Sequence, residues 1–167
     1  IGNLLLVNNL VGALTLLHTL KFSIQGLLEA AKSLELSVKG RIQITPIQNW
    51  ILVDDTYNAN PTSLKSVLGS LRKMYPDRRF VMVIGMMAEL GEQSQRLHHE
   101  SGRMMASCQP AYLLASGDND ARFYLGGWHD GQGSAKMVFY ARDLESAVSH
   151  FQEIIEPGDV VLVKGSR

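Results

Sequence analysis

The sequence has a single cysteine, no excess of charge of either sign and no long hydrophobic run. Cys108 is the only cysteine among 167 residues, so the chain cannot form an internal disulfide or a cysteine-rich zinc site. Its 16 lysine and arginine residues balance 16 aspartate and glutamate residues, and nucleic-acid-binding or membrane-surface proteins usually carry excess positive charge. No apolar run approaches the ~20 residues of a membrane span, and no basic segment precedes an apolar one as in a secretion signal. We therefore expect a cytoplasmic protein with no nucleic-acid partner and no membrane span.

Several nucleotide-binding and catalytic motifs are also missing. No G-x-x-x-x-G-K-[ST] loop occurs, and residues 131–136, GQGSAK, do not have its spacing. No G-x-G-x-x-G follows an expected strand, and neither H-E-x-x-H nor G-x-S-x-G is present. The residues alone therefore predict no cradle for a triphosphate, no complete catalytic site and no metal site.

The first forty residues have a helical pattern. Apolar residues recur at helical spacing from Leu4 to Leu20, and Ser23 suits the N-cap of a second helix over residues 24–34. The pattern breaks at Gly40, so residues 1–39 are predicted to be a helical pair that belongs to a preceding domain. Because the chain begins at Ile1 and opens directly into this pattern, we expect a fragment of a longer protein.

From residue 40 onward, short apolar strands alternate with helices, after a first strand over residues 42–47. The expected strands are residues 50–53, 80–84, 111–115, 137–140 and 160–163; the expected helices are residues 61–75, 94–106 and 144–155, with a helical turn over 119–125 that Gly126 and Gly127 end. Residues 80–84, FVMVI, are typical of a strand covered on both faces. This alternation predicts an α/β fold with a doubly wound, mostly parallel sheet.

Polar residues follow the expected strands, where open α/β sheets bind their ligands. The richest segment, residues 54–61, reads DDTYNANP. Its carboxylates can accept hydrogen bonds from sugar hydroxyls, and its amides can bind a base edge or a peptide. The same residue types also favour turns and helix caps, and spacing alone gives the two interpretations about equal weight.

Residues 54–61 closely resemble the D-D-[ST]-Y-N-A-N-P segment of the Mur ligase family, and three further segments agree in the same order. Gly40-Arg41 precedes the hairpin that the expected strands over residues 42–47 and 50–53 form, with a turn at Gln48-Asn49. Residues 83–92, VIGMMAELGE, are followed by His98 and Gly102. Residues 163–167 read VKGSR. The resemblance covers nearly the whole chain and is weakest over residues 111–140.

The resemblance implies a Rossmann-like carboxyl-terminal domain over residues 40–167, preceded in residues 1–39 by the helical tail of a central ATP-binding domain. The implied activity is an ATP-dependent ligation in peptidoglycan synthesis. In that reaction the terminal carboxylate of UDP-N-acetylmuramoyl-tripeptide becomes an acyl phosphate, and the amine of D-alanyl-D-alanine attacks it. The implied cofactors are ATP and magnesium, with the phosphate loop and the magnesium ligands in the missing central domain. We therefore expect this fragment to be inactive alone and to act with the rest of its own chain.

The resemblance also implies roles for individual residues. Arg41 is implied to contact the γ-phosphate of ATP, and Asp55 to bind the ribose hydroxyls, with Asp54 in its place if the register slips by one. Asn8 matches an asparagine that borders adenine. The implied ATP-binding residues are Asn8, Arg41, Asp55 and Asn58, and the implied substrate-binding residues are Asn60, Lys164, Ser166 and Arg167. For Glu89 and His98 we expect structural roles, capping and packing the start of the helix over residues 94–106.

Two departures from the family pattern keep alternatives open. Leu4 and Leu5 stand where the family has a His-Asn pair, and Met86 stands where it has aspartate. One alternative is a non-catalytic α/β ligand-binding or interaction module that kept the scaffold and lost the site. A separate alternative is a sister Mur ligase with another amino acid substrate, against which residues 57–60 and 164–167 argue, since sister ligases differ there.

Overall fold

The computed structural model describes residues 7–32 and 39–166. The chain divides into two compact units, residues 1–39 and residues 40–167. The assignment of the first unit to a central ATP-binding domain remains a prediction. Among the described residues, no helix has both the length and the apolar character that a membrane crossing requires.

The first unit contains two helices that contact each other, α1 (Val7–Thr19) and α2 (Ile24–Lys32). Ser23 caps α2 as predicted, because its Oγ accepts the backbone N–H of Gly26 at 3.1 Å. The predicted helix extends to residue 34, and its last two residues lie outside the described residues.

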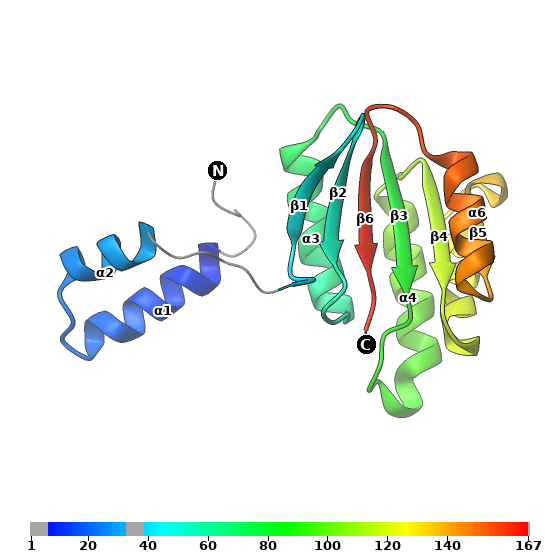
Figure 1. The fold of residues 1–167 in the computed structure, drawn as a ribbon. Helices are drawn as coiled ribbons and strands as arrows, with labels where there is room; N and C mark the ends of the chain where they lie inside the picture. The colour runs from blue at the N-terminus through cyan, green and yellow to red at the C-terminus, as the bar shows by residue number, and fades with distance from the viewer. Residues whose placement is uncertain (1–6, 33–38, 167) are drawn as a thin grey trace. The chain divides into compact units, whose positions relative to one another are not determined.

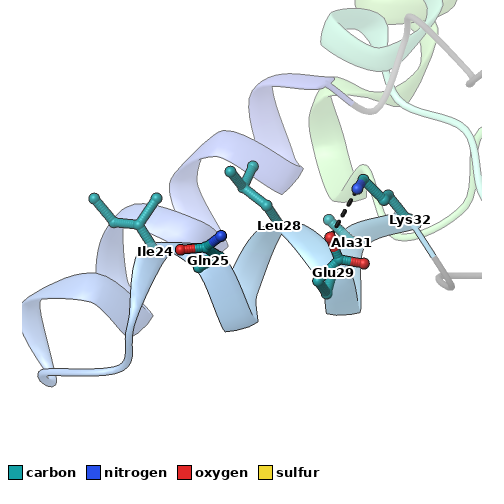
Figure 2. A pocket seen from close by; sticks show the side chains of 6 residues that line it. All are labelled: Ile24, Gln25, Leu28, Glu29, Ala31 and Lys32. Carbon is teal, nitrogen blue, oxygen red and sulfur yellow. Dashed lines mark hydrogen bonds and ion pairs between the residues drawn. The ribbon is translucent and has the colours of Figure 1, made fainter.

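One side of α2 carries a shallow hollow (Figure 2). It is lined by Ile24, Gln25, Leu28, Glu29, Ala31 and Lys32. Ile24 and Leu28 remain more than half exposed, and Glu29 pairs with Lys32 at 2.8 Å. None of the predicted site residues lines this hollow.

The second unit is built on one six-stranded sheet in the order β1-β2-β6-β3-β4-β5 (Figure 1). The strands are β1 (Gln43–Ile47), β2 (Trp50–Asp55), β3 (Phe80–Gly85), β4 (Tyr112–Ser116), β5 (Val138–Ala141) and β6 (Val160–Lys164). β1 and β2 form an antiparallel hairpin, and every other neighbouring pair is parallel. The predicted α/β fold with a mostly parallel sheet is confirmed.

Helices cover the sheet on both faces. The helices are α3 (Pro61–Met74), α4 (Ser94–Ser107), α5 (Phe123–Asp130) and α6 (Leu144–Ile154), with short 3-10 turns η2 (Gly91–Gln93), η3 (Asn119–Arg122) and η4 (Ala135–Met137). In Figure 1, α3 and α4 pass behind the strands. α6 packs against β4 and β5, where Ala147 joins a buried cluster with Leu114 and Ala141. Because both faces are covered, the central strands β3 and β6 are almost wholly buried.

α4 and α5 approach each other backbone to backbone. A Cβ atom on Gly127 of α5 would lie 1.8 Å from the carbonyl oxygen of His99, and one on Gly102 of α4 would lie 2.1 Å from that of Tyr124. The prediction that Gly126 and Gly127 end a helical turn is therefore wrong, since α5 continues through both to Asp130. Here glycine provides space for a second helix and does not stop the first.

Candidate functional site

Gly40 brings Arg41 to the carboxyl end of β2. Gly40 has φ +75°, and a Cβ atom there would lie 2.9 Å from Thr56 Oγ1 and 3.0 Å from the backbone nitrogen of Tyr57. Tyr57 N–H donates to the Gly40 carbonyl at 2.8 Å. This contact places the Arg41 guanidinium 4.0 Å from the centroid of the Tyr57 ring, a cation–π arrangement. Only glycine fits this conformation and this space without strain.

The two neighbouring aspartates have different partners. Asp54 Oδ1 accepts from the backbone N–H of Thr56 at 3.1 Å and from its hydroxyl at 2.7 Å, so this carboxylate shapes the turn. Asp55 Oδ2 instead accepts from Lys164 Nζ at 2.5 Å. Asp55 belongs to the site edge and Asp54 to the turn, which favours Asp55 over Asp54 as the candidate ligand.

Lys164 is the cation at the centre of this edge. It ends β6, where the register pairs it with Asp55 on β2 and with Ile84 on β3. Its side chain is only 2% exposed, and its ammonium group donates both to Asp55 and to the carbonyl oxygen of Asn58 at 2.9 Å. A buried ammonium group needs such partners, because an unpaired buried charge is strongly unfavourable.

Ser166 connects the loops that follow β2 and β3. Its Oγ accepts from the backbone N–H groups of Ala59 at 3.2 Å and Ala88 at 3.1 Å, and it donates to Asn58 Oδ1 at 3.0 Å. Its own N–H donates to the carbonyl of Met86 at 3.0 Å. One side chain therefore joins three strand ends that are far apart in the sequence.

The two asparagines of the β2–α3 loop also have local roles. Asn60 is the N-cap of α3. Its Oδ1 accepts from the backbone N–H of Ser63 at 2.8 Å, and Ser63 Oγ in turn accepts from the backbone N–H of Asn60. Asn58 Oδ1 accepts from Ala59 N–H at 2.8 Å as well as from Ser166. The capping interpretation is thus realised for Asn60, whose side-chain oxygen already serves the helix.

Two predicted site residues cannot be joined to this edge. Asn8 lies in α1, within the first unit. Arg167 lies outside the described residues. The residues that meet at the carboxyl edge of the sheet are therefore Arg41, Asp55, Asn58, Asn60, Lys164 and Ser166.

His98, for which we expected a structural role at the start of the helix, also stabilises the loop after β3. It is fully buried, its Nε2 accepts the N–H of Met87 at 2.9 Å, and its Nδ1 lies 2.8 Å from the carbonyl oxygen of Ser94. These contacts assign the proton to Nδ1. Glu89 does not cap the helix, since the N-cap of α4 is Gln93 and that of η2 is Leu90. Glu89 is exposed with φ +62° and forms part of the turn before them.

Sequence reasoning assigned no role at this edge to four residues that contribute to it. Tyr57 stacks under Arg41, and the backbone N–H of Ala88 reaches Ser166. Gly85 and Gly165 let β3 and β6 approach closely where they end, since a Cβ atom on Gly165 would lie 3.2 Å from Gly85 Cα. The glycines that directly follow apolar strands were the available signal for this approach.

The buried hydroxyl of Tyr124 contacts the end of β3 at the same edge. It donates to the carbonyl of Gly85 at 3.1 Å, and burial raises the pKa of Tyr124 well above that of an exposed tyrosine. The hydroxyl therefore stays protonated and available as a donor. Among residues 7–32 and 39–166, no cluster of three or more His, Cys, Asp or Glu side chains could bind a metal ion.

Comparison with known families decides the relationship. The model of the family described as "Mur ligase, glutamate ligase domain" matches residues 40–167. The chain belongs to the Mur ligase family. The match begins at Gly40 and so coincides with the second compact unit.

Relatives within the Mur ligase family agree with the match. The chain is 32% identical over 162 residues to the UDP-N-acetylmuramoyl-tripeptide–D-alanyl-D-alanine ligase of Rickettsia prowazekii, covering 96% of this chain and 34% of that protein. The chain therefore spans about a third of the length of the curated relatives it matches.

Solved structures give the same result. A crystal structure of MurF from Acinetobacter baumannii superposes with a TM-score of 0.79 at 27% identity, covering 96% of this chain and 34% of that one. The MurF ligase from Thermotoga maritima in complex with ADP superposes with a TM-score of 0.70 at 26% identity, covering 92% and 33%. The fold of this chain is thus that of Mur ligase proteins.

Proposed function

We propose that this chain is the carboxyl-terminal part of an ATP-dependent ligase that joins D-alanyl-D-alanine to UDP-N-acetylmuramoyl-tripeptide in peptidoglycan synthesis. The observation that carries the proposal is the single edge at which Arg41, Asp55 and Ser166 meet around one loop, residues 56–60. The relative from Rickettsia prowazekii and the ADP-bound MurF structure support it. A cytoplasmic location follows as part of the same proposal.

On the nucleotide side, Arg41 and Asp55 are the principal groups. Arg41 is exposed and oriented by Tyr57, so its guanidinium can bind the γ-phosphate and offset charge that develops during phosphoryl transfer. The Asp55 carboxylate can accept hydrogen bonds from ribose hydroxyls. Asn58 would lie beside them, and Asn8 keeps the role beside adenine that the family resemblance implies.

On the peptide side, Ser166 and Asn60 are the candidates, with Arg167 beside them. A hydroxyl and a cation suit the free carboxylate of a dipeptide. The oxygen of Asn60 serves the helix cap, which leaves its amide nitrogen for a ligand. Ser166 already makes several contacts within the chain, which fix the position of its hydroxyl.

ATP supplies the phosphoryl group that activates the tripeptide carboxylate, and magnesium would be bound by the central part of the longer protein. The residues described here would close over the reactants. Such closure orients the attacking amine and excludes water, which would otherwise hydrolyse the acyl phosphate.

The test uses the full-length protein and a panel of amines. Its upstream sequence is expected to contain a G-T-[NS]-G-K-T segment, and ADP release is expected only with tripeptide and D-alanyl-D-alanine both present. Release with a single amino acid in place of the dipeptide would assign a sister ligase of the family instead.

Substitution of Arg41 and Asp55 separates the enzyme from a non-catalytic module. In the full-length protein, Arg41→Ala and Asp55→Ala are each expected to lower the ligation rate by about a hundredfold or more, with an unchanged circular-dichroism spectrum. Lys65→Ala, at an exposed position on α3, is the matched control. Wild-type turnover in both variants would favour the non-catalytic module.

A further inference from the structure

Lys164 is oriented toward the chain's own groups and not toward a ligand. Its ammonium group is 2% exposed and donates to a carboxylate on β2 and a carbonyl of the β2–α3 loop. An ammonium group that binds the carboxylate of an incoming dipeptide would have to leave these partners. That exchange would leave Asp55 buried without its counter-charge, at a large cost in free energy.

Asp55 has the complementary geometry. One of its oxygens, Oδ2, accepts from Lys164. Within residues 39–166, its other oxygen, Oδ1, makes no hydrogen bond, and the side chain retains 10% exposure. The ion pair therefore fixes the orientation of the carboxylate and leaves one oxygen able to accept from a ligand hydroxyl.

The second contact of Lys164 acts on the same loop. Nζ binds the carbonyl oxygen of Asn58, while Ser166 Oγ binds its side chain. Both interactions originate from the end of β6, and they fix the loop that carries Tyr57, on which Arg41 stacks. Lys164 thus positions both groups that are proposed to bind the nucleotide. It contacts Asp55 directly, and it acts on Arg41 through the loop that carries Tyr57.

We infer that Lys164 is a positioning residue for nucleotide binding, which fixes the Asp55 carboxylate and the β2–α3 loop, and that it does not contact the dipeptide. The inference rests on the proposed function for the identity of the reaction. It replaces the substrate contact that the family resemblance implies for this residue.

The experiment compares three variants of the full-length protein: Lys164→Met, Asp55→Asn and the double variant. Methionine keeps the length of the side chain without its charge, and the double variant leaves no unpaired buried charge, which protects the fold. The measurements are KM for ATP, KM for D-alanyl-D-alanine and the affinity for ADP by calorimetry.

Each single variant is expected to raise KM for ATP by about ten- to a hundredfold, as loss of a charged hydrogen bond does. KM for the dipeptide is expected to change by less than about threefold. In the Asp55→Asn background, the further change to methionine is expected to raise KM for ATP by a smaller factor than it does in the wild type, because the contribution through Asp55 is already lost and only the contact of Lys164 with the Asn58 carbonyl remains.

A rise in KM for the dipeptide on Lys164→Met, with KM for ATP unchanged, would overturn the inference and restore the substrate contact. Should Lys164→Met fail to fold, the double variant is compared with Asp55→Asn instead. A rise in KM for the dipeptide, with KM for ATP unchanged between these two variants, would likewise overturn the inference.

The calorimetric arm separates this inference from the proposed function. A wild-type protein that binds ADP but does not ligate the dipeptide contradicts the proposed function, and the loss of ADP affinity in Lys164→Met then still supports the positioning role. If Lys164→Met binds ADP as tightly as the wild type does, the positioning role is contradicted. If the wild-type protein does not bind ADP, the positioning role and the proposed function are both contradicted.

Discussion

At the scale of single residues, several side chains of the site serve the fold at the same time. Asn60 caps α3, Asp54 closes a turn, and Ser166 joins two loops. The polar cluster DDTYNANP therefore provides the turn and the helix cap that its spacing allowed, and its role in ligand binding stays a proposal. The sequence could not show which residue of the cluster has which role, because an Asp or Asn that caps a helix and one that binds a ligand are the same residue type at the same strand end.

A substitution at Gly40 tests whether the backbone next to Arg41 requires glycine. Gly40→Ala is expected to lower the free energy of unfolding of the chain by roughly 1–3 kcal/mol, because alanine is strained at positive φ and its Cβ meets the backbone of Tyr57. Urea denaturation measures the change.

Gly69→Ala is the matched control for that substitution. Gly69 lies inside α3 with open space around it, so alanine there is expected to stabilise the chain by about 0.5–1 kcal/mol. Equal effects at the two positions would mean that residue 40 does not require glycine.

At the scale of elements, the strands were predicted better than the helix near residues 119–130. The buried strands are short apolar runs, and β3 and β6 appear close to their predicted bounds. α5 was predicted to end at Gly126 because glycine usually terminates helices. The reason it continues is tertiary, the direct approach of α4, and no local pattern in the sequence reports such an approach.

Neighbouring glycines of α5 test this explanation. Gly127→Ala is expected to lower the free energy of unfolding by at least about 2 kcal/mol, because its Cβ would overlap the backbone of α4. Gly126→Ala meets only the side chain of His99, at 3.3 Å, so its effect is expected to stay within about 1 kcal/mol. Thermal or urea denaturation of the two variants decides, and equal losses would contradict the packing argument.

The N-cap of α6 predicts a pH dependence. The backbone N–H of Ser146 donates to the Asp143 carboxylate at 2.7 Å and lowers the pKa of Asp143 below its ordinary value of 3.8. A lowered pKa in the folded state means that the ionised cap stabilises α6 above the unfolded-state pKa, and that this stabilisation is lost as the pH falls through the folded-state pKa.

Asp143→Asn measures that contribution, since asparagine caps a helix without titrating. The difference in free energy of unfolding between wild type and variant is expected to be constant from about pH 7 to pH 5 and to shrink below about pH 4. Urea denaturation at pH 7, 5 and 3 provides the values. A difference that is the same at pH 3 and pH 7 would show that the charge of Asp143 does not stabilise the cap.

At the scale of the whole molecule, the site could be located from the sequence because parallel strands share one carboxyl edge. That rule brings Asp55, Ser166 and the loop after β3 together without any knowledge of contacts. It could not reveal that Lys164 is buried by its neighbours, since burial depends on β6 lying between β2 and β3. Nor does it place Asn8, which belongs to the other compact unit.

The proposed function predicts that residues 1–167 alone do not ligate. Because the chain spans about a third of the curated relatives it matches, the phosphate loop and the UDP-sugar site are expected elsewhere in the longer protein. No phosphate release above background is expected from the isolated chain with ATP, tripeptide and dipeptide, whereas the full-length protein is expected to release phosphate. Turnover by the isolated chain would contradict the dependence on the missing parts.

The position of β6 has a consequence for biogenesis. Among the strands of the described residues, β6 comes last in the sequence, yet it lies between β2 and β3 and pairs with both. Until it emerges from the ribosome, the β1–β2 hairpin and the β3–β4–β5 layer have no strand to join them, and each exposes an unpaired edge. A nascent chain interrupted before Val160 would thus hold two separate half-sheets, each prone to self-association through its unpaired edge.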